Sequence, residues 1–182
     1  MIVALIGYRC TGKTSLGKGL AARLCWRFVD SDAFIEQKAG KSIDEIVSQG
    51  GWPLFREMEK EAIKELVALD HVVLATGGGA VLAQGNVQLL QEQGVVVWLK
   101  ADAQTIRDRM LADPKTILQR PGLTSQGALD EIETVLAERT SIYEKAAHII
   151  LDTSVKPVSW LSEEALVLLY NNQMAKERLF RE

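Results

Sequence analysis

The chain opens with a short apolar run that leads into a glycine-containing loop. Residues 7–14 read Gly-Tyr-Arg-Cys-Thr-Gly-Lys-Thr, which fills every fixed position of the pattern Gly, four residues, Gly-Lys-Ser/Thr. Residues 1–5 have the length and the β-branched, apolar side chains that are typical of a buried parallel strand. Leu16, Leu20 and Leu24 are spaced to share one helix face. Strand, glycine loop and helix in this order predict a phosphate-binding loop and therefore a nucleoside triphosphate ligand.

The physics of such a loop assigns roles to its residues. Glycines let backbone N–H groups turn toward an anion, and the following helix N-terminus adds partial positive charge. We expect Lys13, at the loop surface, to reach the β- and γ-phosphates and the Thr14 hydroxyl to hold Mg²⁺. A chance match in a glycine turn is the alternative, which the flanking strand and helix disfavour. The predicted ATP contacts are Gly7, Arg9, Cys10, Thr11, Gly12, Lys13, Thr14 and Ser15.

Composition narrows the class of protein. The 182 residues suggest one domain, 1–182, and a net charge of −3 offers no basic field for nucleic acid. No apolar run is long enough to span a bilayer, and a core strand at the N-terminus leaves no room for a signal peptide.

Two cysteines make no disulfide framework, so we expect a reduced, cytoplasmic protein. Cys10 either fills a variable loop position or is a reactive thiol. Without an unexplained apolar stripe, we expect a monomer.

Apolar runs alternate with helical patterns along the rest of the chain. This alternation predicts an α/β domain with a parallel sheet covered by helices on both faces. Residues 112–127 contain prolines and glycines without periodicity, which is typical of an active-site lid. The predicted strands are 1–5, 26–30, 71–76, 95–99 and 148–152. The predicted helices are 15–24, 33–38, one from a capping box at Ser42 to the Gly50-Gly51 break, 52–69, 86–93, 102–111, 128–147 and 158–170.

Two further clusters follow predicted strands, where open α/β sheets bind ligands. Asp30 and Asp32 are two residues apart, so in extended backbone both would face one way. They could hold metal-bound water or accept hydrogen bonds from a hydroxylated substrate, or Asp32 could simply cap the helix after it. The three glycines 77–79 let a backbone approach a ligand closely, although a tight turn would also use them.

Isolated charged residues are most simply interpreted as surface groups. The charges on the long helix 52–69, Glu59 among them, fit a solvated face. Histidines that precede apolar strands suit exposed strand edges. The residues interpreted in this way are Arg56, Arg120, Arg139, Glu59, His71 and His148.

Taken together and in order, these segments resemble the shikimate kinase family from about residue 2 to 153. The phosphate loop alone is common to many NTPases, but the joint order and spacing is specific. The segments are residues 7–14, Phe28-Val29-Asp30-Ser31-Asp32 with Ile35-Glu36, Phe55-Arg56 with Glu59, Gly77-Gly78-Gly79-Ala80, Arg120-Pro121, and Arg139 three residues before Ile142-Tyr143.

The resemblance implies a fold, a reaction and a nucleotide site. The fold would be that of nucleoside monophosphate kinases, with a five-stranded parallel sheet and a lid. The reaction would transfer the ATP γ-phosphate to the 3-hydroxyl of shikimate in aromatic amino-acid biosynthesis. By position, Lys13 would contact the phosphates, Thr14 the magnesium, and Asp30 the metal through water. Arg120 would reach from the lid to the transferring phosphate.

The resemblance also assigns the substrate side. Asp32 would bind substrate hydroxyls and either orient the attacking one or take its proton. Arg56 and Arg139 would hold the carboxylate, and Gly78 and Gly79 would offer backbone contacts.

Some positions depart from the family pattern or stay open. The lid sequence Arg-Pro-Gly-Leu-Thr from 120 to 124 resembles the longer lid of the second isoform of enteric bacteria. Arg109 and the turn 152–154 are candidates for the adenine contacts. Two alternative functions remain: another small-molecule kinase of this fold, such as a gluconate or nucleotide kinase, and a regulatory module that has lost catalysis. Arg56, Arg139 and the triple glycine disfavour the first, and Lys13, Thr14, Asp32 and Arg120 together disfavour the second.

Overall fold

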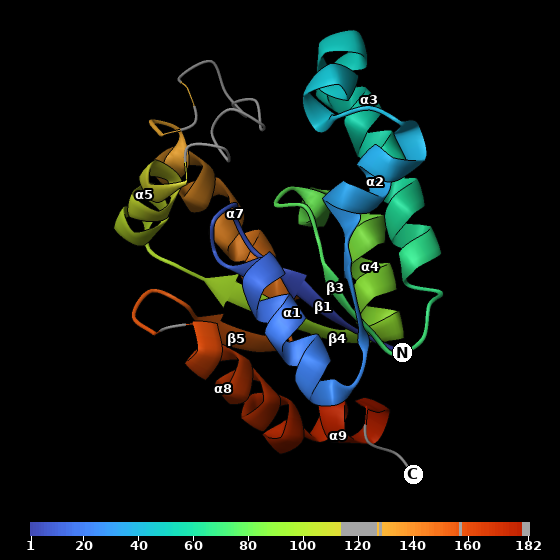
Figure 1. The fold of residues 1–182 in the computed structure, drawn as a ribbon, viewed down its shortest axis with the longest axis vertical. Coiled ribbons are helices and arrows are strands. Elements are labelled where there is room, and N and C mark those ends of the chain that lie inside the picture. The colour runs from blue at the N-terminus through green and yellow to red at the C-terminus, as the bar shows by residue number, and fades with distance from the viewer. Residues whose placement is uncertain (114–126, 128, 157, 180–182) are drawn as a thin grey trace.

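The computed structural model describes residues 1–113, 127, 129–156 and 158–179. Most of the lid expected at 112–127, including Arg120, lies outside the described residues. The described chain forms a central sheet with helices on both faces (Figure 1).

Five strands form one parallel sheet, as predicted, in the order β2-β3-β1-β4-β5. The predicted strand positions are confirmed to within one residue at each end. The central strand β1 is an unbroken apolar run with every side chain fully buried, which suits a strand covered on both faces. The strands are β1 (Ile2–Ile6), β2 (Arg27–Asp30), β3 (Val72–Ala75), β4 (Gly94–Lys100) and β5 (Ile149–Asp152).

The helices cover the sheet in two layers. One layer packs α1, α8 and α9 against residues such as Val3 and Leu5, and the other packs α3, α4 and α7 against Ile2 and Ala4 (Figure 1). Successive residues of β1 therefore alternate between the two cores. The helices are α1 (Lys13–Leu24), α2 (Ser31–Ala39), α3 (Ile43–Leu66), η1 (Ala80–Leu82), α4 (Gln84–Gln93), α5 (Ala103–Ala112), α7 (Ile132–Ala146), α8 (Val158–Asn171) and α9 (Gln173–Leu179).

Helix α3 contains two helical segments joined at a kink. The capping box predicted at Ser42 is confirmed, since its hydroxyl accepts from Glu45 N while the Glu45 carboxylate accepts from Ser42 N. Gly51 breaks the helix with φ 69° and ψ 179°, and Pro53 occupies the first turn of the second segment. The kink lets the first segment lie with α2 beside the pocket described below.

Several sequence expectations need correction. The helix expected at 52–69 ends at Leu66, and the one expected at 128–147 begins only at Ile132. His148, expected at an exposed strand edge, is half-buried, and its Nδ1 accepts a hydrogen bond from Val96 N of β4 at 3.0 Å. Burial lowers the pKa of this imidazole. Helix α8 does carry an exposed apolar stripe, formed by Trp160, Val167 and Tyr170. No helix in the described part of the chain is long and apolar enough to cross a bilayer.

We expect Ser42→Ala to lower the free energy of unfolding by about 1 kcal/mol, because the Glu45 N–H in the first turn of α3 loses the hydroxyl that accepts its hydrogen bond. Urea unfolding followed by circular dichroism would measure the loss. Ser48→Ala is the matched control, since Ser48 is an exposed residue inside the same helix. An equal effect of both substitutions would contradict a capping role for Ser42.

Candidate active site

The pairing of β1 with β3 brings two loops to one edge of the sheet. One is the phosphate loop, residues 7–14, and the other is residues 77–79, called the glycine segment below. Leu5 lies opposite Ala75, and the next residue, Thr76, donates to Leu5 O from both its N–H (3.0 Å) and its hydroxyl (3.1 Å). A Cβ on Gly78 would lie 3.5 Å from Gly7 O. The phosphate loop and residues 77–79 therefore lie side by side, as expected for strand ends of one parallel sheet.

The phosphate loop has the backbone that its glycines permit. Gly7 has φ 141°, and a Cβ there would lie 2.5 Å from Leu99 O. Gly12 precedes α1 with φ 92°. Lys13 is not at the loop surface as expected: it is 9% exposed, and its Nζ donates to Gly7 O (2.8 Å) and Tyr8 O (2.7 Å). The lysine thus folds back over its own loop.

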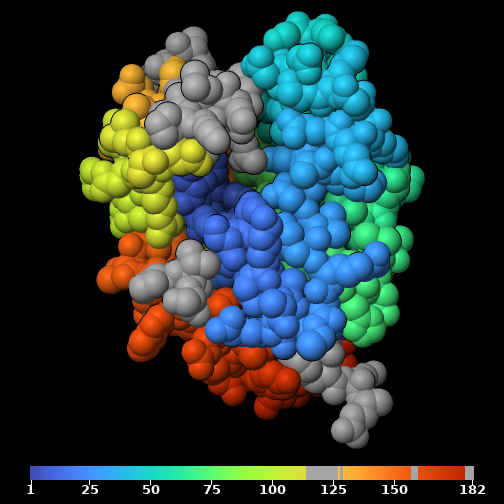
Figure 2. Space-filling view, in the orientation of Figure 1, coloured from blue at the N-terminus to red at the C-terminus, as the bar shows by residue number. Residues whose placement is uncertain are grey.

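Figure 2 shows where this loop lies in the molecule. The loop and α1, in blue, occupy the front face between α5 in yellow-green and the α2–α3 region in cyan. A hollow there is lined by residues 10–16 of the loop and by Asp30, Asp32 and Arg109. Arg109 donates to Cys10 O at 3.2 Å and to Thr153 Oγ1 at 3.3 Å, so the two adenine candidates named from sequence meet beside the loop.

The two aspartates after β2 take different positions. Asp30 caps α2, because its Oδ1 accepts from Asp32 N (3.0 Å) and Ala33 N (3.4 Å). The interpretation of Asp32 as a cap is therefore wrong, and so is the expectation of a shared extended backbone, since α2 begins at Ser31. The Thr14 hydroxyl donates to Asp30 Oδ2 at 3.0 Å. Asp32 is 8% exposed and lines both the loop hollow and a second pocket.

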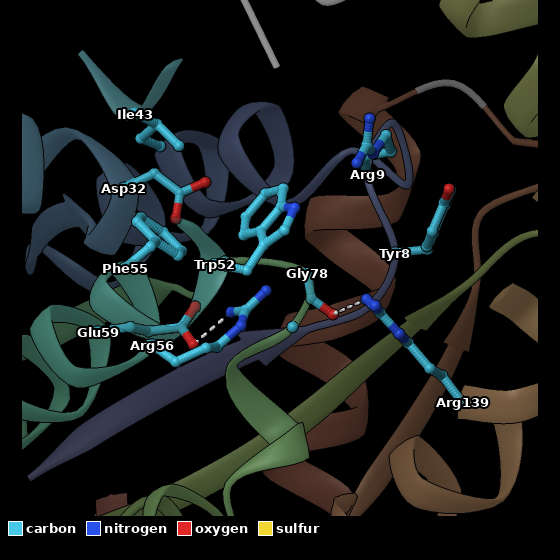
Figure 3. Close-up of a pocket in the computed structure, with 12 residues that line it drawn as sticks. Tyr8, Arg9, Asp32, Ile43, Trp52, Phe55, Arg56, Glu59, Gly78 and Arg139 are labelled. Atoms are coloured by element: carbon cyan, nitrogen blue, oxygen red, sulfur yellow. Dashed lines mark hydrogen bonds and ion pairs between the residues drawn. The ribbon is translucent and has the colours of Figure 1, made fainter. Parts of the chain in front are cut away.

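The second pocket, shown in Figure 3, has an apolar side and a charged side. Ile43, Trp52 and Phe55, from the two segments of α3, form the apolar side. Such a pocket can bury one face of a small ring while polar groups fix its orientation. The remaining lining residues are Tyr8, Arg9, Asp32, Arg56, Glu59, Gly77, Gly78, Gly79 and Arg139.

Arg56 is held by contacts on two sides. Its NH1 lies 2.5 Å from Glu59 Oε2, one turn along α3, and its guanidinium lies over the Trp52 ring at 5.3 Å from the centroid. Glu59 is fully buried, so the expectation that it belongs to a solvated face is wrong. A Cβ on Gly77 would lie 2.6 Å from Asp32 Oδ1 and 2.7 Å from Glu59 Oε1, so both carboxyls face Gly77.

Burial dominates the protonation of Glu59. It raises the pKa of this carboxyl above its usual value, while the Arg56 guanidinium opposes the rise and the charge of Asp32 adds to it. Glu59 Oε1 has no hydrogen-bond partner in the part of the chain that the structure describes. The pocket floor therefore has unused acceptor capacity next to a cation.

Arg139 enters the same pocket from α7. It is 8% exposed, and its NH1 donates to Gly78 O at 3.3 Å. Figure 3 shows Arg56 and Arg139 on opposite sides of Gly78. Two arginines that lie 83 positions apart in sequence thus face one small cavity.

Arg9, which lines the second pocket, belongs to a buried ion pair that the sequence did not reveal. Arg9 NH2 lies 3.6 Å from Glu131 Oε1, and the two residues are 6% and 0% exposed. The Tyr8 hydroxyl donates to the same oxygen at 3.5 Å. Burial raises the pKa of Tyr8 to about 12, so the phenol stays protonated. Glu131 follows a stretch without periodicity, so no pattern marked it.

The arrangement can transfer a phosphoryl group to a small anionic acceptor. The loop hollow offers backbone donors and Lys13 for phosphates, and the second pocket offers two guanidinium groups for an anion. Asp32 borders both spaces, where it can accept a proton or a hydrogen bond from a hydroxyl.

Comparison with known proteins agrees with this chemistry. The family model described as shikimate kinase matches residues 9–170. A shikimate kinase of Oleidesulfovibrio alaskensis is 41% identical over 92% of this chain and 96% of its own length. A shikimate kinase 2 of an Enterobacter species is 42% identical over 85% of this chain and 88% of its own. The structure of shikimate kinase from Acinetobacter baumannii in complex with shikimate matches with a TM-score of 0.88 and 31% identity, covering 95% and 94% of the two chains.

We expect Glu59→Gln to stabilise the protein progressively as pH rises. A raised folded-state pKa means that the wild type has its full stability below the ordinary value of 4.5 and loses part of it as pH rises through the folded-state value. Glutamine cannot ionise and escapes this loss. Urea unfolding of both proteins between about pH 5 and pH 8 would measure the difference.

Glu61→Gln is the control, because Glu61 is exposed on the same helix and should show no such trend. If the wild type instead gains stability over Glu59→Gln as pH rises, the ion pair with Arg56 outweighs burial.

Proposed function

The chain belongs to the shikimate kinase family, and from this premise we propose how its residues transfer the γ-phosphate of ATP to the 3-hydroxyl of shikimate. The chain phosphorylates shikimate with ATP as the phosphoryl donor. The main support for the mechanism is the position of Asp32. It lines both the hollow beside the phosphate loop and the second pocket, which also contains Arg56 and Arg139. Phosphoryl transfer asks a protein mainly to align reactants and neutralise charge.

We assign ATP to the loop hollow. The backbone N–H groups of residues 7–15 and the N-terminus of α1 would hold the phosphates. Lys13 would exchange its two carbonyl partners for the β- and γ-phosphates. Arg120 is proposed to complete the charge around the transferring group from the lid, outside the described residues. Arg109 and the turn at Thr153 are the proposed neighbours of the adenine.

Thr14 and Asp30 fit a magnesium ion. Both offer oxygen, which Mg²⁺ prefers, and their side chains already lie 3.0 Å apart. Among the described residues no group of three or more histidine, cysteine or acidic side chains could hold a metal, so waters and phosphates would fill the other positions. Bound Mg²⁺ supplies charge neutralisation on the phosphate oxygens.

Shikimate would occupy the pocket beside the loop. Arg56 and Arg139 bind its carboxylate, and the Gly78 and Gly79 N–H groups contact its polar groups. Asp32 accepts a hydrogen bond from the attacking hydroxyl and either orients it or takes its proton. Ile43, Trp52 and Phe55 pack against the ring and limit water in the pocket.

We extend the proposal to the setting of the enzyme. The two small-molecule substrates need no nucleic acid or membrane partner, and a net charge of −3 suits this. The free thiols of Cys10 and Cys25 fit a reducing cytoplasm. We propose a monomer as the active unit.

We expect ADP release by the purified protein to depend strongly on shikimate. A coupled assay with ATP and Mg²⁺, with and without shikimate, would measure this. Lys13→Ala should remove nearly all of the shikimate-dependent rate and keep the circular dichroism spectrum of the wild type. Release that depends on gluconate or a nucleoside monophosphate, and not on shikimate, would reject the assignment.

We expect Arg56→Lys and Arg139→Lys each to weaken shikimate use at least about tenfold, with ATP binding nearly unchanged. A guanidinium can bind both carboxylate oxygens at once, and a charge-assisted hydrogen bond contributes about 1.5–3 kcal/mol. Steady-state kinetics with each substrate varied in turn would separate the two effects.

An amide analogue of shikimate tests the same assignment from the ligand side. Replacing the carboxylate by a neutral amide should cost the wild type much affinity and cost the lysine variants far less. If both variants keep the full preference for the acid, the carboxylate does not contact these arginines.

A further inference from the structure

Tyr143 lies directly behind the glycine segment of the pocket. It is one turn after Arg139 on α7, and its hydroxyl donates to Gly78 O at 2.5 Å. Its ring is 1% exposed and stacks on Trp98 of β4, with centroids 5.8 Å apart and planes at 20°. The sequence singled out Tyr143 as part of a segment but gave it no role.

Within the described residues, two backbone N–H groups of the glycine segment 77–79 have no hydrogen-bond partner, while its other backbone groups do. Gly77 N–H donates to Ser31 Oγ at 2.9 Å, and Gly77 O accepts from Ala80 N at 3.1 Å. Gly78 O accepts from Arg139 and Tyr143, and Gly79 O accepts from Leu82 N at 3.0 Å. Among the described residues, the N–H groups of Gly78 and Gly79 have no such partner. Both glycines line the pocket, so these donors are available to a ligand.

A planar trans peptide couples Gly78 O to one of these donors. In a trans peptide the C=O of one residue and the N–H of the next point in opposite directions, and the described part of the chain has no cis peptide bond. The carbonyl of Gly78 points toward Arg139 in Figure 3. The Gly79 N–H therefore points to the other side, where a Cβ on Gly79 would lie 2.3 Å from Arg56 NH2.

Building on the proposed function, we propose that Tyr143 is a positioning residue for substrate recognition. Its hydroxyl, together with Arg139, fixes the Gly78–Gly79 peptide so that the Gly79 N–H faces the shikimate pocket. Two consecutive glycines have little intrinsic preference among backbone conformations, so this peptide needs an external contact to hold one orientation. Of the two donors, the Tyr143 hydroxyl makes the shorter contact with Gly78 O, 2.5 Å against 3.3 Å for Arg139 NH1, and it has no proposed role in binding the carboxylate.

The Tyr143 hydroxyl can donate this hydrogen bond at all ordinary pH values. Burial raises the pKa of Tyr143 to about 12, with the Arg139 charge opposing the rise. The phenol therefore keeps its proton and remains a donor. The stacked Trp98 ring fixes the direction in which it donates.

Tyr143→Phe tests the proposal, because it keeps the ring and its stacking and removes only the hydroxyl. We expect the KM for shikimate to rise about threefold to tenfold, the range that corresponds to one hydrogen bond, while the KM for ATP stays within about twofold. Tyr170→Phe, half-exposed on α8, is the matched control and should change neither.

A second readout uses ¹⁵N-glycine-labelled protein without ligands. The Gly79 amide signal should shift or broaden in Tyr143→Phe, while the Gly12 and Gly40 signals stay in place. An unchanged Gly79 signal with an unchanged shikimate KM would overturn the proposal, and so would an equal rise in both KM values, which would indicate a packing role. If the wild type does not use shikimate but the Gly79 signal responds, the proposed function fails and the positioning role stands.

Discussion

The parallel pairing of β1 with β3 is the contact on which the whole site depends. Glycine-containing loops follow both strands, and the register that places Leu5 opposite Ala75 brings the two loops to the same edge of the sheet. Hydrogen bonds from Thr76 to Leu5 O extend that register one residue past the sheet. A slip of the pairing would separate the phosphate loop from the glycine segment 77–79, which lines the second pocket.

Local patterns in the sequence were enough for the fold and for one half of the site. Short apolar runs and their spacing located all five strands, because a buried parallel strand needs little besides a continuous apolar segment. The phosphate loop was identified because its glycines, Lys13 and Thr14 lie within the eight consecutive residues 7–14. The capping box at Ser42 was also found, since both partners lie within four residues. The resemblance to the shikimate kinase family, and not a local pattern, then assigned Arg56 and Arg139 to one pocket.

The rest of the site depends on contacts between distant segments, which local patterns do not record. Glu59 looked solvated because its neighbours on α3 are charged, yet packing against α2 and the glycine segment buries it. Asp30, and not Asp32, caps α2, because this helix begins at Ser31, two residues earlier than its apolar pattern suggests. The pair of Arg9 and Glu131 joins segments more than 120 residues apart. Arg9 and Glu131 can both be buried because each compensates for the lost hydration of the other.

The internal hydrogen bonds of Lys13 bear on how tightly the proposed nucleotide site would hold its ligand. The ammonium group already donates to two carbonyl oxygens of its own loop. If Lys13 takes its proposed place on the β- and γ-phosphates, nucleotide entry exchanges one set of hydrogen bonds for another, and only the difference contributes to affinity. The reverse exchange would then accompany departure of the diphosphate, because the two carbonyls accept the lysine again as the phosphates withdraw. On this proposal, the lysine that attracts the triphosphate also lowers the barrier to product departure, a step that limits turnover in many enzymes.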